Sequence, residues 1–106
     1  MKLTLVETKT IEDRKLERYE IADYEVKVVY RKDGDTSISV REKRDDYLPT
    51  IYCRDGYGAG IQGFEIQTTS YGALSPEEIR KMVDALNQAV EVAEILTKTF
   101  VKMEEK

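Results

Sequence analysis

A glycine-rich segment between two predicted strands is the first candidate for ligand chemistry in this sequence. It reads Asp55-Gly56-Tyr57-Gly58-Ala59-Gly60, and glycines in such a run can expose backbone N–H groups to an anion. The segment lacks the Lys-Ser/Thr pair of a P-loop, and a strand rather than a helix follows it. It is therefore either a loop that contacts a ligand or a flexible hairpin connection, and the sequence leaves both open.

Arginine and tyrosine side chains form a second candidate, on the outward face of the predicted sheet. Arg41, Arg54 and Tyr52 share this face by strand parity. Guanidinium groups can bind phosphate through two parallel hydrogen bonds, and aromatic rings can stack on bases. Glu25 and Glu65 have the same parity, so a solvated face with cross-strand ion pairs is the alternative.

Tyrosine is unusually frequent, with seven residues against two Phe and no Trp. Its rigid ring and polar tip suit interfaces and ligand stacking. Tyr24 and Tyr30 alternate with polar residues in the clearest strand, which favours the core. Tyr57 and Tyr71 lie in predicted loops that flank the last strand, where both can reach one end of the sheet.

Catalytic constellations are missing from the sequence. The chain has no His and one Cys, which excludes His-based nucleophile systems, internal disulfides and the usual zinc ligands. The adjacent carboxylates Asp45-Asp46 and Glu104-Glu105 fall in a turn and a terminal tail, where nothing would desolvate them and tune their pKa values. Cys53 is expected on the inner sheet face, as an inert small apolar residue. We therefore expect a protein that is not an enzyme and has no cofactor or metal ion.

Size, charge and hydropathy describe a small globular protein. The 106 residues carry a net charge of −4, which argues against general polyanion binding. No apolar run is long enough for a membrane span or a signal peptide. We expect one domain over residues 1–106, located in the cytoplasm, or in the host cytoplasm if the chain is phage-encoded.

The fold predicted from these patterns is α+β. Residues 1–70 read as an antiparallel meander of five or six strands, of which 23–31 alternates most clearly and Asp33-Gly34 marks a hairpin turn. Residues 75–103 read as a C-terminal helical region, introduced by the capping sequence Ser75-Pro76-Glu77-Glu78.

The predicted helix is longer than a globule of this size. Residues 76–101 would span about 39 Å at about 1.5 Å per residue, against a diameter of roughly 33 Å for a 106-residue sphere. One apolar row runs through Ile79, Val83, Leu86 and Val90, and the apolar surface widens after Val90. Either the helix breaks near Asn87-Gln88, or it pairs with a second copy, with the excess length at the apolar C-terminal end. We expect a homo-oligomer, at least a dimer, that associates through this helix.

The order of a strand meander, a glycine loop bearing Tyr and Arg, and one long capped helix resembles phage-encoded Thoeris anti-defence sponges. That resemblance implies a small dimer or higher oligomer that sequesters cyclic ADP-ribose isomers. No position here matches that family's ligand contacts, so no site residue is transferred from it. The order is also similar to the single-stranded-DNA-binding fold of the transcriptional positive-coactivator class, although this chain is acidic and lacks a basic arm.

The most economical hypothesis is a binding module that sequesters a small nucleotide-like anion. A single-stranded nucleic-acid-binding protein and an inhibitor acting through protein–protein contact are the alternatives. Charge, ring and loop position select five candidate ligand contacts: Arg41, Arg54, Tyr57, Tyr71 and Arg80.

Overall fold

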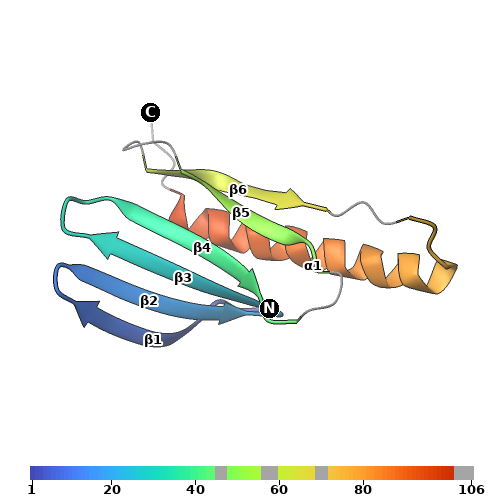
Figure 1. Ribbon diagram of the computed structural model, residues 1–106, viewed down its shortest axis with the longest axis horizontal. Coiled ribbons are helices and arrows are strands. Elements are labelled where there is room, and N and C mark those ends of the chain that lie inside the picture. The colour runs from blue at the N-terminus through green and yellow to red at the C-terminus, as the bar shows by residue number, and fades with distance from the viewer. Residues whose placement is uncertain (45–47, 56–59, 69–71, 102–106) are drawn as a thin grey trace.

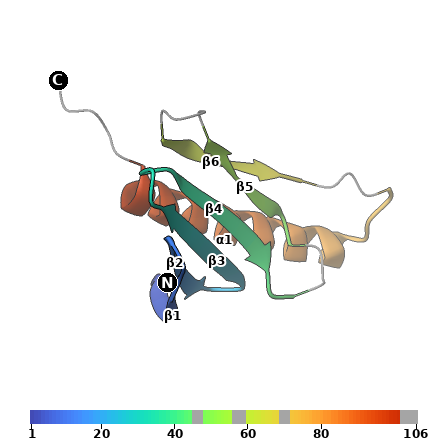
Figure 2. The same ribbon diagram turned by 60° about the vertical axis from the view of Figure 1, so that its left-hand side comes forward.

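The computed structural model contains two antiparallel sheets and one long helix. It describes residues 1–44, 48–55, 60–68 and 72–101. The elements in these residues are β1 (Thr4–Ile11), β2 (Arg14–Ile21), β3 (Tyr24–Arg31), β4 (Thr36–Glu42), β5 (Thr50–Asp55), β6 (Ile61–Gln67) and α1 (Pro76–Phe100). Figure 1 shows the helix running along both sheets, and the turned view in Figure 2 shows it on one side of them. The predicted α+β class is confirmed.

The strands divide into two sheets rather than one. A four-stranded sheet has the order β1-β2-β3-β4, and a two-stranded sheet pairs β5 with β6. Every hydrogen-bonded pair is antiparallel and joins neighbours in the sequence, so the connections are those of a meander. The meander is interrupted between β4 and β5, a division that strand periodicity does not encode.

Two tight turns connect the first three strands without a glycine. Ile11 pairs with Arg14 across the first turn, and Ile21 pairs with Tyr24 across the second. The first turn residue in each case, Glu12 or Ala22, has a positive φ, of 54° and 51° respectively. This left-handed conformation costs a residue with a Cβ about 1 kcal/mol, so both turns are held by the ladders on either side.

The inner faces of both sheets form the core together with the C-terminal half of α1. The predicted parity is confirmed, because Val28, Ile38 and Ile51 are buried and Arg41 and Arg54 are exposed. The buried apolar residues are Ile21, Tyr24, Val26, Val28, Ile38, Ile51, Ala89, Val92, Ala93 and Leu96. All the helical members of this set lie after Gln88.

Helix α1 begins with the predicted capping box. The Ser75 hydroxyl accepts a hydrogen bond from the Glu78 N–H at 3.2 Å, and the Glu78 carboxylate accepts one from the Ser75 N–H at 3.1 Å. The carboxylate gains from this bond only when ionised, so the bond lowers the pKa of Glu78. Both contacts satisfy N–H groups that the first helical turn leaves without partners.

The helix is continuous through Asn87-Gln88, so the alternative of a break is wrong. The Gln88 amide instead donates to the Asp23 carboxylate at 3.1 Å, and its oxygen accepts from the Asp23 N–H at 3.4 Å. This side chain ties the turn between β2 and β3 to the middle of α1. The expected location of the excess length is also wrong: the C-terminal half is buried, and the N-terminal half extends past the sheets (Figure 1).

Relief of the positive φ at Ala22 should stabilise the protein. We expect Ala22→Gly to raise the free energy of unfolding by about 0.5–1 kcal/mol, because glycine adopts this conformation without a Cβ clash. The same substitution inside α1, Ala85→Gly, should lower it by about 1 kcal/mol. Urea unfolding measures both, and a loss of stability in both variants would contradict the turn strain.

Removal of the Tyr24 hydroxyl should destabilise the core. This side chain is fully buried, and its hydroxyl donates to the Pro49 carbonyl at 2.7 Å. Tyr24→Phe leaves that buried carbonyl without its donor, which should cost about 1–3 kcal/mol. Tyr52→Phe, at a ring that is 51% exposed, is the matched control and should change the stability little.

The same two variants test a pH dependence. Burial, followed by the negative charges of Glu42 and Asp23, raises the pKa of Tyr24 to about 12. The folded state thus favours the neutral phenol, and this contribution is complete below about pH 10 and is lost as pH rises toward 12. Alkaline urea titrations should show a steeper loss of stability in the wild type than in Tyr24→Phe.

Candidate functional site

The structure does not bring the predicted arginines together. Arg41 lies near the end of β4, Arg54 near the end of β5, and Arg80 in the second turn of α1. Figure 1 places the ends of β4 and β5 toward opposite ends of the molecule, because the two strands run in opposite directions. Tyr57 and Tyr71 lie outside the described residues. The predicted five-residue anion site is therefore not assembled from its described members.

Carboxylates compensate two of these arginines. Arg41 Nη2 lies 3.3 Å from Glu25 Oε1, and Arg54 Nε lies 3.2 Å from Glu65 Oε1. Both guanidinium groups remain mostly exposed. The cross-strand ion pairing that was the alternative for this face is what the structure shows.

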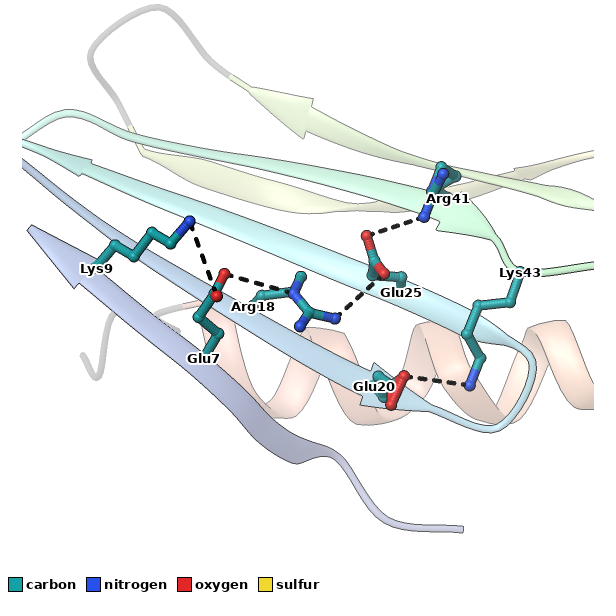
Figure 3. A network of polar contacts seen from close by, with 7 residues as sticks. All are labelled: Glu7, Lys9, Arg18, Glu20, Glu25, Arg41 and Lys43. Atoms are coloured by element: carbon teal, nitrogen blue, oxygen red, sulfur yellow. Dashed lines mark hydrogen bonds and ion pairs between the residues drawn. The ribbon is translucent and has the colours of Figure 1, made fainter. Parts of the chain in front are cut away.

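The outer face of the four-stranded sheet carries a balanced network of charges (Figure 3). Glu25 lies between two arginines, with Arg18 Nη1 3.4 Å away on the side opposite to Arg41. Glu7 in turn contacts Arg18 at 3.7 Å and Lys9 at 3.8 Å. Alternating signs across neighbouring strands stabilise a solvated sheet face, and they leave little positive charge for a nucleic-acid backbone.

A cavity at one end of the molecule is the best-formed concave site in the described part of the chain. It has a volume of about 780 Å³, within the range of small-molecule sites. Three elements meet there: the hairpin turn between β3 and β4, the start of β6 and the last turn of α1. The lining residues are Tyr30, Asp33, Gly34, Asp35, Thr36, Ile38, Gly60, Ile61, Thr99 and Phe100.

Aromatic rings and oxygen atoms dominate this lining. Phe100 is fixed by an edge-on contact with Tyr19, with ring centroids 5.8 Å apart. Tyr30 lies beneath the Lys15 ammonium group at 5.9 Å, and burial together with the nearby Glu17 carboxylate raises its pKa, so its phenol stays neutral. The Asp33 carboxylate accepts the Asp35 N–H at 3.0 Å and shapes the turn. The wall thus offers ring faces, hydroxyls and two carboxylates.

Local sequence patterns did not single out this cavity. Asp33-Gly34 was recognised as a hairpin turn and Phe100 as the end of the apolar helical row, but these segments are far apart in the sequence. Gly60 is the exception, because it ends the predicted glycine loop and has a φ of 85°. The remaining lining residues could be identified only from the packing of α1 against the sheets.

Cys53 is not placed for nucleophilic chemistry. Burial, with a smaller effect from the Asp55 charge, raises the pKa of its thiol to about 11. The thiolate is therefore scarce near neutral pH. Among the described residues, no three or more His, Cys, Asp or Glu side chains cluster in a way that could hold a metal ion.

Comparisons with known proteins add no functional assignment. Neither a family model, nor a curated protein, nor a solved structure matched the chain. The resemblance to anti-defence sponges therefore stays a prediction from the order of elements. Within the residues that the structure describes, no helix is long and apolar enough to cross a membrane.

Neutralisation of Glu25 should loosen the charge network on the outer face. The Glu25 side chain is only 18% exposed and contacts both Arg18 and Arg41, so Glu25→Gln should cost about 1 kcal/mol of stability at low salt. Glu65→Gln removes an exposed pair and should cost less than half of that. Urea unfolding in about 1 M NaCl should shrink the Glu25 effect, and equal losses in both variants would count against a network.

Proposed function

We propose that this protein is a non-enzymatic binding module that sequesters a small nucleotide-like ligand in the end cavity. The observation that supports this is the cavity itself, a space of about 780 Å³ lined by two aromatic rings and several oxygen atoms. The absence of His from the sequence and the raised pKa of the Cys53 thiol favour capture over catalysis.

The chemistry of the lining fits a nucleoside better than a bare phosphate. Phe100 and Tyr30 offer ring surfaces against which a base can pack. Asp33 and Asp35 can accept hydrogen bonds from sugar hydroxyls, as acidic residues do in many nucleotide sites, and Thr36 and Thr99 add hydroxyl groups. A ligand with several hydroxyls would use both kinds of wall.

The two carboxylates limit where a phosphate can lie. Asp33 and Asp35 repel negative charge, and the described lining contains no Lys or Arg. The phosphate of a bound nucleotide should therefore point away from them, toward Gly60 at the end of the glycine loop. Together with the resemblance to anti-defence sponges, this makes cyclic ADP-ribose isomers the first class of ligand to test.

A ligand screen tests the proposal directly. Purified protein is mixed with cyclic ADP-ribose isomers, cyclic di- and trinucleotides or a short DNA single strand, and thermal unfolding is recorded. A ligand at a hundred times its dissociation constant stabilises a protein by about 2.7 kcal/mol. We expect a shift with a small cyclic nucleotide, and chromatography after heating should recover that nucleotide unchanged.

A pair of aromatic substitutions locates the site. Phe100→Leu keeps an apolar side chain but removes the ring, and it should weaken binding about tenfold. Tyr52→Leu removes an exposed ring outside the cavity lining and should leave the affinity unchanged. Equal effects in calorimetry would place the ligand elsewhere. A shift with the single strand alone would support the nucleic-acid-binding alternative, and no shift with any compound would end the proposal.

A further inference from the structure

Helix α1 presents two separate apolar faces, and the sheets cover one of them. Ala89, Val92 and Leu96 are buried against the sheets. Ile79, Val83 and Val90 remain 47%, 48% and 45% exposed, and half-buried Leu86 lies between the last two. We call Ile79, Val83, Leu86 and Val90 the exposed row. At 100° per residue, it lies roughly a quarter turn from the buried face.

The exposed row has the spacing of a helix–helix seam. Its members are separated by four, three and four residues, the alternation with which one helix packs into the side chains of another. Part of the row lies on the half of α1 that extends past the sheets (Figure 1). Neither sheet of the same molecule therefore covers it.

We propose that a second copy of this chain packs antiparallel on the exposed row, around a two-fold axis near Asn87. Leu86 of one copy then lies against Val90 of the other. The interface is distinct from the end cavity, because Thr99 and Phe100 line the cavity at the opposite end of the helix. The proposal is thus independent of the ligand.

The charges beside the row select both the occupant and its direction. Arg80 and Glu94 are exposed, on the same side of the row, and each lies seven residues from Asn87. In an antiparallel pair centred on Asn87, Arg80 of each copy meets Glu94 of the other. A parallel pair in register would oppose Arg80 to Arg80 and Glu94 to Glu94, which is unfavourable. The helix is therefore complementary to itself in one orientation.

Sedimentation equilibrium over a wide range of protein concentrations tests the association. We expect a monomer–dimer equilibrium for the wild type. The double variant Ile79→Glu/Val83→Glu should raise the dissociation constant at least about a hundredfold, because it places charges in an apolar seam. Ile11→Glu makes the same change at a comparably exposed apolar residue on β1 and should leave the equilibrium unchanged. Far-ultraviolet circular dichroism checks that each variant is folded.

Charge reversal tests the orientation. Arg80→Glu and Glu94→Arg should each weaken the dimer about fivefold, and the double reversal should restore it. Both side chains are exposed, so these variants keep the fold. A wild type that stays monomeric at the highest concentration overturns the proposal, as does association that is insensitive to the exposed row. Failure of the double reversal to restore the dimer overturns the antiparallel arrangement.

Discussion

Burial of the C-terminal half of α1 is the interaction on which the rest of this structure depends. The two sheets share no hydrogen-bonded ladder, so their relative position rests on side-chain packing around Val92 and Leu96. Tyr24 adds a directional element, because its buried hydroxyl binds the Pro49 carbonyl ahead of β5 and so links the two sheets. Gln88 fixes where along the helix this packing begins, through its two hydrogen bonds to Asp23. Without the helix, both sheets would expose their apolar faces.

The same packing separates two surfaces along one helix. Where α1 ends, its last turn meets the hairpin between β3 and β4 and the start of β6, and these segments enclose the end cavity. Where α1 begins, it extends past the sheets and leaves the exposed row uncovered. A helix shorter by three turns would cover the sheets equally well but would have no such row. The length of α1 is therefore better explained by an interaction than by the core of one chain.

Electrostatic balance on the sheet explains why arginine content was a poor guide to an anion site. Arg18 and Arg41 project from neighbouring regions of one face, as strand parity predicts, but Glu25 lies between them within 3.4 Å of each. Exposed ion pairs of this kind add modest stability. They also cancel the local potential that a phosphate would need. The cavity lining, which has carboxylates and rings, points to hydroxyl and base recognition instead.

Local patterns in the sequence determined much of the secondary structure. Period-two alternation in residues 23–31 and the capping sequence at Ser75 identified β3 and the start of α1, because both signals depend on neighbouring residues alone. The sequence also contained both apolar rows of the helix, but it could not tell which one the sheets would cover. Tertiary structure decided that, along with the division into two sheets, the pairing of Glu25 with Arg41 and the meeting of Asp35 with Phe100. Each of these depends on contacts between residues far apart in the chain, whose free energy is set by packing and charge rather than by local periodicity.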